Sequence, residues 1–306
     1  MNHSLRGYTT AILADVATDA LGEQIAQDVN AVAHLVSRTN DLALALTDFA
    51  VPTSARKAVL QDLLGARVHP LALKVVLRAV DTGRVEEFPT VLHELYELAR
   101  HMHDLAPEEL RAEEPIVSRT AWRDYVVGYA DAVFEDVTET SELEEIEDEL
   151  FRFARVIDSS NSLRSVLADT TVPLENREQI LDDLLEGKVR PATLRLVRVT
   201  IQGRVRDLAS SLDWLAEQAA RARGWRIARI YTGLPIDADE HRILSEALER
   251  LTSQPVELQI LAAPDILGGA VIHIGDLLVD ASAQRRLDQL EENLLKLEGA
   301  TRGAHT

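Results

Sequence analysis

Residues 265–282 read DILGGAVIHIGDLLVDAS and mark the place where the helical pattern of the chain gives way to strands. A short block of β-branched residues lies between Gly268-Gly269 and Gly275-Asp276. Glycine adopts the positive φ angles that tight turns need, so the pattern predicts a strand, a tight turn and a second short strand. Ser282 or Asp280 is then placed to cap a following helix. Because no side chain of the stretch belongs to a nucleophile or metal-ligand motif, we expect it to be a scaffold for recognition.

The region around this stretch alternates strands and helices. Strands are predicted at Ile227–Tyr231 and Val256–Leu261, with a helix between them that begins at Asp237 or Asp239. A last amphipathic helix is predicted at Ala283–Leu297, before a short polar tail. Residues 224–306 are therefore predicted to form a small α+β domain with a disordered tail.

Upstream, the chain repeats itself. Gly7-Tyr8 recurs as Gly128-Tyr129 and Val51-Pro52 as Val172-Pro173, always 121 positions apart (128 − 7). The same offset carries Arg56 onto Arg177. Chance matches in a leucine-rich chain would align leucines, but they would not keep Gly, Pro and Arg in register, so we interpret the pattern as a tandem duplication.

Each copy has the helical periods, prolines and glycines of about six helices. In the second copy, Pro191 is placed in the first turn of a fifth helix that Gly203 ends, and Ser141-Glu142-Leu143-Glu144 has a capping-box pattern. The predicted fold class is mainly α: two tandem six-helix bundles followed by a small α+β C-terminal domain. The predicted boundaries are residues 1–105 for the first bundle, 106–117 for a linker, 118–223 for the second bundle and 224–306 for the C-terminal domain.

Composition excludes several classes of function. The formal charge is −19, with 51 acidic against 32 basic side chains, and such an excess repels nucleic acid and anionic lipid headgroups. No cysteine is present, which excludes disulfides, thiolate catalysis and cysteine-ligated zinc. No apolar run approaches the roughly 18 residues of a membrane span. We therefore expect protein partners, no nucleic acid and no direct membrane insertion.

A search for chemistry finds no convincing catalytic, cofactor or metal site. Glu186-Gly187-Lys188-Val189 lacks the upstream glycine and the Ser or Thr of a phosphate-binding loop. His93, Glu97 and His101 share a helical spacing that a metal could use, but a solvated helix end is the simpler interpretation. His273 has no nucleophile or acid partner in sequence. The sequence therefore predicts no catalytic residue, no cofactor and no metal.

Two features allow more than one interpretation. The acidic run from Glu142 to Glu149 is interleaved with apolar residues at helical spacing, so it is either a solvated helix face or a docking surface for a basic partner. In addition, two helices carry a second apolar row beside their core stripe. That row either places both helices centrally in the bundle or forms a groove for an external helix. Its members are Val127, Ala130, Phe134, Leu196 and Val199.

Three segments of the sequence resemble a known protein family. Residues 266–282, followed by Arg286-Leu287, closely resemble the C-terminal signature of the delta subunit of F-type ATP synthases, a family that includes the mitochondrial oligomycin-sensitivity-conferring protein. Tyr129–Phe134 resembles the opening pattern of that family, and Pro173–Leu185 resembles its fourth helix. The family signature consists of Gly268, Gly269, Gly275, Asp276, Asp280 and Ser282. The extra first bundle is similar to the duplicated bundle of actinobacterial delta proteins.

The resemblance implies a mechanical function without catalysis. It implies a peripheral-stalk (stator) subunit that links the catalytic α3β3 head to the b subunits, so that rotor torque drives ATP synthesis. The implied partners are the N-terminal helices of the α subunits, for which the apolar row of five residues is the expected site, and the b subunits, for which the end of the chain is expected. The implied location is peripheral, at the cytoplasmic face of the cell membrane. A generic helical adaptor that binds two protein partners is the alternative.

Overall fold

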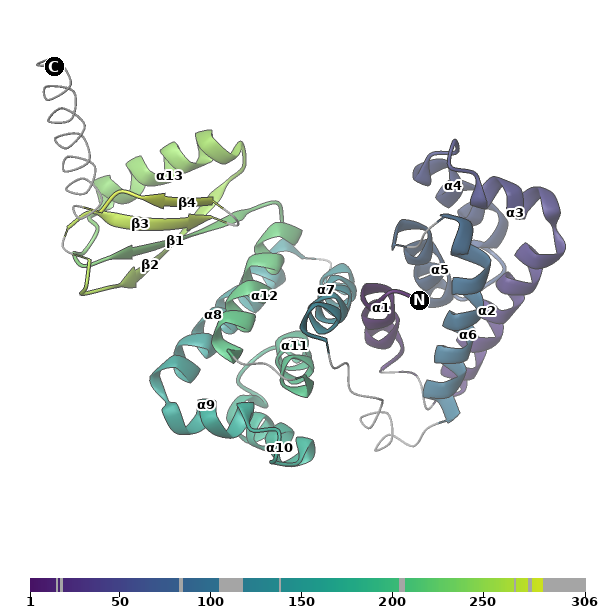
Figure 1. Cartoon of the computed structure of the whole chain (residues 1–306), viewed down its shortest axis with the longest axis horizontal. Coiled ribbons are helices and arrows are strands. Elements are labelled where there is room, and N and C mark those ends of the chain that lie inside the picture. Colours follow the sequence, from purple (N-terminus) through teal and green to yellow (C-terminus); the bar gives the residue numbers. More distant parts are fainter. Residues whose placement is uncertain are drawn as a thin grey trace, which may run out of the picture. The chain divides into compact units, whose positions relative to one another are not determined.

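The structure is a computed structural model that describes residues 1–14, 16, 19–82, 85–104, 118–137, 139–203, 207–266, 268–274 and 277–282. The chain is mainly helical, with a small four-stranded mixed sheet near its C-terminus (Figure 1). It forms two compact units, Met1–Leu215 and Ala216–Thr306. Among the described residues, none of the helices is both long enough and apolar enough to span a membrane.

The first copy of the repeat contains six described α-helices and one short 3-10 helix. They are α1 (His3–Leu13), α2 (Ala20–Arg38), α3 (Asn40–Thr47), α4 (Thr53–Leu64), α5 (Pro70–Thr82), η1 (Val85–Glu87) and α6 (Phe88–Asp104). Asn2 caps α1, because its side chain accepts a hydrogen bond from the Leu5 amide at 2.7 Å. The long helices α2 and α6 pack against each other and bury aliphatic side chains between them.

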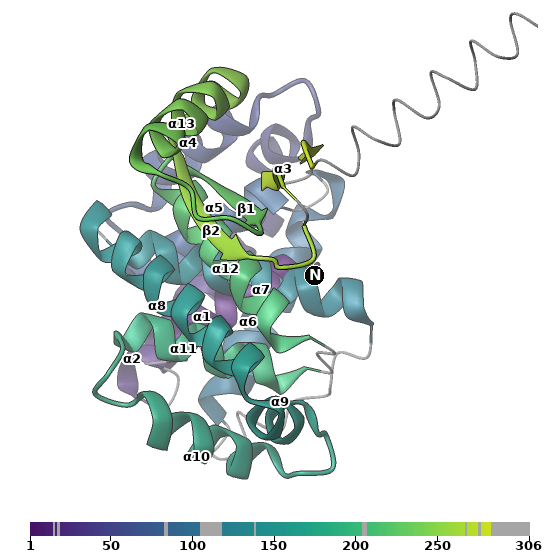
Figure 2. The same cartoon turned by 90° about the vertical axis from the view of Figure 1, so that its left-hand side faces the viewer.

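The second copy has the same order of helices. They are α7 (Arg119–Asp136), α8 (Thr140–Ser159), α9 (Asn161–Ala168), α10 (Leu174–Leu185), α11 (Pro191–Gln202) and α12 (Leu208–Ala222). The helices α3 and α9, and likewise α4 and α10, begin and end 121 positions apart, which is the offset of the sequence repeat. The short helices α9 and α10 lie together at one end of this group (Figure 2).

Helix α8 shows how the apolar spacing determines packing. Leu143, Ile146, Leu150 and Phe153 recur at helical spacing and are all buried, as predicted. The predicted capping box at Ser141 is wrong. The N-cap position lies two residues earlier, at Glu139, which makes no side-chain hydrogen bond there. The helix begins at Thr140, so Ser141 lies inside the first turn.

The C-terminal unit contains β1 (Arg226–Thr232), α13 (Ala238–Thr252), β2 (Val256–Ala262), β3 (Ala270–Ile274) and β4 (Leu277–Asp280). The strand order is β2-β1-β3-β4, with β1 and β2 parallel and the other pairs antiparallel. Asp237 caps α13 with a capping box that involves Glu240, in agreement with the predicted start of this helix. The parallel pair is joined through α13, as such connections usually are.

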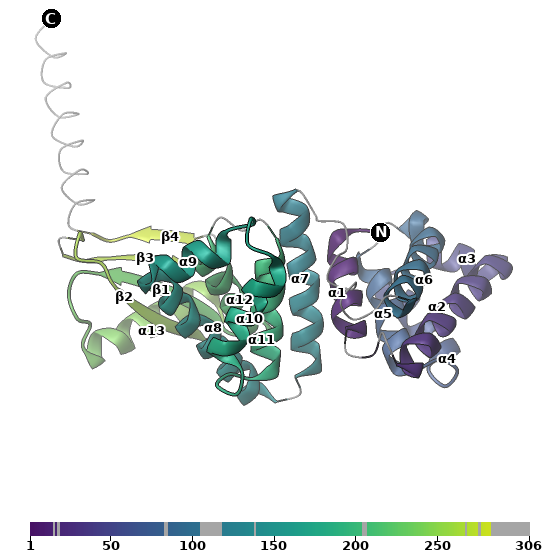
Figure 3. The same ribbon diagram turned by 90° about the horizontal axis from the view of Figure 1, so that it is seen from below.

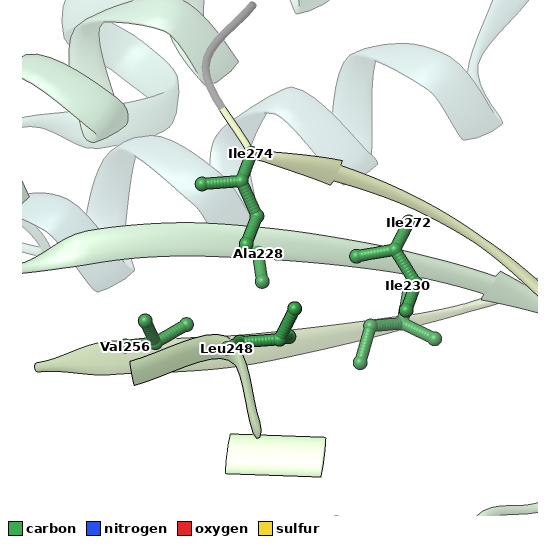
Figure 4. Packing of buried hydrophobic residues seen from close by; sticks show 6 residues of the cluster. All are labelled: Ala228, Ile230, Leu248, Val256, Ile272 and Ile274. Atoms are coloured by element: carbon green, nitrogen blue, oxygen red, sulfur yellow. The ribbon is translucent and has the colours of Figure 1, made fainter. Parts of the chain in front are cut away.

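One face of the sheet is covered by α13 and forms a small apolar core (Figure 4). Leu248 of α13 packs with side chains from β1, β2 and β3 that alternate along their strands. The buried cluster consists of Ala228, Ile230, Leu248, Val256, Ile272 and Ile274. The β-branched block noted in the sequence therefore supplies the two isoleucines of β3.

The predicted strand pair after Gly268-Gly269 is confirmed. In β3 and β4, Ile274 lies opposite Leu277, which is the register of a hairpin. Gly275 and Asp276, the predicted helix Ala283–Leu297 and the predicted tail lie outside the described residues.

Candidate functional site

The five residues of the apolar row lie on two neighbouring helices, three on α7 and two on α11. Ala130 and Leu196 are 0% exposed, Val199 is 2% exposed and Phe134 is 6% exposed, whereas Val127 is partly exposed. This burial is what a central position in the bundle predicts. That the row also binds an external helix stays a prediction, and Val127 is the member that a partner can reach first.

Helix α7 is also in close contact with α1. The first helices of the two copies lie side by side (Figures 1 and 3). A Cβ atom added to Gly7 would lie 1.9 Å from the carbonyl oxygen of Tyr125, and one added to Gly128 would lie 1.7 Å from the carbonyl oxygen of Ser4. Real Cβ atoms do not approach backbone so closely, so only glycine permits this packing at both positions.

Charged side chains surround this glycine contact. Arg78 of α5 donates a hydrogen bond to Asp131 of α7 and lies 3.9 Å from Glu135, and its guanidinium stacks over the ring of Tyr8 at 5.0 Å from the centroid. Tyr8 in turn donates a hydrogen bond to Glu135. Burial and then the bond to Glu135 raise the pKa of the Tyr8 hydroxyl, so it stays a donor at all physiological pH values.

The fifth helix of each copy also reaches the first helix of the other copy. Lys74 of α5 places its Nζ 2.9 Å from Asp136 Oδ1 at the end of α7. Arg195 of α11 donates from Nη2 to the carbonyl oxygen of Ala11 near the end of α1, at 2.7 Å. Basic groups at a helix C-terminus interact favourably with the helix dipole and its unpaired carbonyls. The two copies are thus joined by both backbone contact and polar bonds.

The acidic run on α8 meets a basic group of the same chain. Arg190, the residue before α11, lies 3.2 Å from Glu142 through Nη1 and also pairs with Glu145. Its backbone amide donates to Glu149 at 3.0 Å. Three acids of the run are therefore engaged by the start of α11, which joins α8 to α11. That the run also binds an external basic partner stays a prediction.

The described signature residues of the C-terminal unit shape the backbone. Gly268 and Gly269 have φ angles of 84° and 78°, as the turn prediction required. A Cβ on Gly269 would lie 2.3 Å from the carbonyl oxygen of Ala281. Asp280 accepts a hydrogen bond from the Ser282 amide at 3.0 Å, which turns the chain after β4. Gly275 and Asp276 lie outside the described residues.

The residues weighed for chemistry do not come together. His93 Nε2 lies 4.0 Å from Glu97 on an exposed face of α6, in keeping with a solvated helix end. His273 packs its ring edge against Tyr231, with 5.3 Å between ring centroids. Over the described ranges, no group of three or more His, Cys, Asp or Glu side chains is arranged to hold a metal ion.

Sequence reasoning missed the contact between the copies. Gly7 and Gly128 were recognised only as markers of the repeat, although a glycine in the middle of a helix costs helix stability and therefore calls for a packing explanation. That signal was available in the sequence. The partners Tyr125 and Ser4 carried no comparable signal, because their contribution is a backbone carbonyl oxygen.

The structure therefore defines a mainly helical protein, in which two helical copies are in close contact and a small mixed sheet belongs to a second unit. The model of the family described as ATP synthase delta (OSCP) subunit matches residues 5–118 and 127–294. The chain belongs to this family, whose members are non-catalytic structural subunits of the F-type ATP synthase and components of its peripheral stalk, the stator.

Two relatives, compared by sequence, agree with this assignment. The chain is 31% identical to the ATP synthase subunit delta of Frankia casuarinae over 274 residues, which cover 89% of this chain and 88% of the relative. It is 32% identical to the subunit delta of Parafrankia sp., over 89% of this chain and 87% of the relative. A chain of the Toxoplasma gondii mitochondrial ATP synthase hexamer aligns with 55% of this chain and 95% of its own length, at 21% identity and a TM-score of 0.39.

Proposed function

We propose that this stator subunit binds the N-terminal helices of the α subunits through its helical unit and the ends of the b subunits through its C-terminal unit. The family match, which extends over both helical copies and the C-terminal unit, is the observation that carries the proposal. In this arrangement the subunit holds the catalytic head against the torque of the rotor, at the cytoplasmic face of the membrane. The proposal includes two six-helix bundles, residues 1–105 and 118–223. It is supported by three pairs of helices that start 121 positions apart: α3 and α9, α4 and α10, and α5 and α11.

The proposed α-helix site is the surface of α7 and α11 around Val127. Phe134 is only 6% exposed, so a charged residue there would destabilise the core of the bundle and would not report on binding at its surface. Val127 is partly exposed and belongs to the same apolar row, which makes it the suitable position for a test. An amphipathic helix binds such a site with its apolar face, and a few anchor side chains of that helix make the main contacts.

Val127→Glu is expected to weaken binding of an α N-terminal peptide to the full chain by at least about tenfold, roughly 1.4 kcal/mol, because a charge would be buried against the peptide. Titration calorimetry measures the affinity and circular dichroism checks the fold. Val156→Glu is the matched control, since Val156 is a valine of α8 that is 48% exposed. Equal affinity of the folded Val127→Glu variant and wild type would show that the peptide binds elsewhere.

The proposed b site is at the end of the chain, after the hairpin β3–β4. A chain that ends at Ser282 keeps all four strands and the hydrogen bond from the Ala281 amide to the Ala270 carbonyl, at 2.9 Å. This shortened chain is expected to lose the b subunits in a pull-down while it retains the α peptide. A chain that ends at Leu297 is the control and is expected to retain both. If the chain ending at Ser282 still captures b, the contact lies on the sheet or α13.

A further inference from the structure

We propose that the first copy of the repeat is a built-in partner of the second: the two copies bind each other through equivalent faces of their first and fifth helices, as the subunits of a two-fold dimer do. The pairing occurs within one chain and is specific for unlike copies. The inference concerns the helical unit alone and does not depend on the proposed α or b contacts.

The glycine contacts have the reciprocity of a two-fold interface. Under the offset of 121, Ser4 is equivalent to Tyr125 and Gly7 is equivalent to Gly128. Gly7 approaches the carbonyl of Tyr125, and Gly128 approaches the carbonyl of Ser4, so each contact is the image of the other. In an isologous interface, residue i contacts j while j contacts i. The order of the two contacts also shows that α1 and α7 run antiparallel here.

The fifth helices repeat the same reciprocity. Lys74 and Arg195 are equivalent under the offset. Lys74 reaches the end of α7 through Asp136, and Arg195 reaches the end of α1 through the carbonyl of Ala11. A basic group at one position of the fifth helix therefore meets the C-terminal end of the first helix of the other copy, twice. The two basic residues and the two glycines thus occupy repeat-equivalent positions, although the acceptors Asp136 and Ala11 are not themselves equivalent.

Arg78 breaks the symmetry and makes the pairing specific. Its carboxylate partners Asp131 and Glu135 are equivalent to Thr10 and Ala14 of the first copy, while Arg78 itself is equivalent to Val199. If two first copies paired, Arg78, whose side chain is 19% exposed, would lose both of these carboxylate partners and would face Thr10 and Ala14 in their places. Losing two carboxylates from a largely covered guanidinium is unfavourable. Pairing of unlike copies is therefore preferred over pairing of like copies.

The face can be tested in the full chain with a carbodiimide, which joins a lysine amine to a carboxylate without a spacer. An equimolar mixture of unlabelled and 15N-labelled chains is treated and the linked peptides are identified by mass spectrometry. The Lys74–Asp136 link is expected only between peptides of the same isotope. Lys57 and Asp81, which pair within the first copy, provide the control link. Absence of Lys74–Asp136 beside a normal control link, or mixed-isotope pairs at the statistical share, would overturn the proposal.

Two variants then test the glycine contact from both sides. Alanine favours a helix over glycine, so Gly128→Ala and Gly7→Ala should leave the helical content unchanged or higher while they remove the close approach. Both are expected to lose the Lys74–Asp136 link and to keep the Lys57–Asp81 link. Wild-type yield of the Lys74–Asp136 link in both variants would refute the proposed face.

The preference for pairing of unlike copies is tested with Arg78→Val. This substitution gives the first copy the valine that the second copy has at the equivalent position, Val199. We expect a reduced Lys74–Asp136 yield and the appearance of mixed-isotope links between Lys74 and Asp15, the residue of the first copy that is equivalent to Asp136. Arg152→Val is the matched control, because Arg152 pairs with Asp148 along the surface of α8, 2.6 Å between Nη2 and Oδ2. A result for Arg78→Val identical to that for Arg152→Val would refute the role of Arg78.

Discussion

Replacement of Gly269 by alanine is expected to destabilise the C-terminal unit by about 3 kcal/mol. A left-handed φ costs an L-residue roughly 1–2 kcal/mol, and forcing backbone apart adds a cost of about 1–3 kcal/mol. Both terms act at Gly269, where φ is 78° and an added Cβ would lie 2.3 Å from the carbonyl oxygen of Ala281. The backbone after β4 would have to move, and the edge of the sheet with it.

Gly224 offers a control in the same unit. Its φ is 82°, but an added Cβ would meet no atom within 4 Å. Gly224→Ala should therefore carry only the conformational cost, about 1–2 kcal/mol. Hydrogen exchange of β1 and β3 amides, followed by mass spectrometry, reports the stability of this unit without assuming that the whole chain unfolds in one step. Equal losses in the two variants would contradict the close approach to Ala281.

Arg177→Met is expected to destabilise the second copy by about 3 kcal/mol. Arg177 is 5% exposed and donates from Nη1 to the carbonyl oxygens of Leu167 and Ile201, at 3.2 Å and 2.7 Å. These carbonyls belong to the last turns of α9 and α11, where the helix supplies no donor. Burial lowers the pKa of Arg177, but a guanidinium remains charged at neutral pH. Its removal leaves two buried acceptors unpaired, at about 1–3 kcal/mol each.

The duplication supplies the control for this prediction. Arg56 is the equivalent residue of the first copy and is also buried, at 7% exposure, but its described bond goes to the hydroxyl of Thr53 at 3.1 Å. Arg56→Met should therefore cost only about 1 kcal/mol. Hydrogen exchange of α9 and α11, compared with α3 and α5, measures both effects. If both variants lost equal stability, the bridging of two helix ends would not explain the burial of Arg177.

For the stator function, the two units present different kinds of surface. The helical unit has an internal partner for one side of α7 and a partly exposed valine on another, so an external helix is expected on the side of Val127. In the C-terminal unit α13 covers one face of the sheet, and the exposed Leu278 and His273 belong to the opposite face. The two proposed contacts can therefore be disrupted independently.

Much of the architecture could be predicted because it depends on local pattern. The buried stripe of α8, the first-turn proline of α11 and the capping of α13 by Asp237 are local signals that the structure confirms. The start of α8 was predicted wrongly at Ser141, because a capping pattern one residue inside a helix is indistinguishable in sequence from one at its end. The burial of the row from Val127 to Val199 could not be decided, since a central helix and a groove helix have the same apolar pattern.

The sequence by itself determined the duplication, the helix-rich class, the change from helices to strands after residue 224 and the positive φ angles at Gly268 and Gly269. These features follow from the periodicity of the sequence and from the conformational freedom of single residues. Both are local properties that can be evaluated from the sequence. Only the tertiary structure decided that Gly7 and Gly128 bring α1 and α7 together and that Arg78 pairs across the copies. Those contacts join residues more than 50 positions apart, and their energy depends on backbone approach and desolvation that no local pattern records.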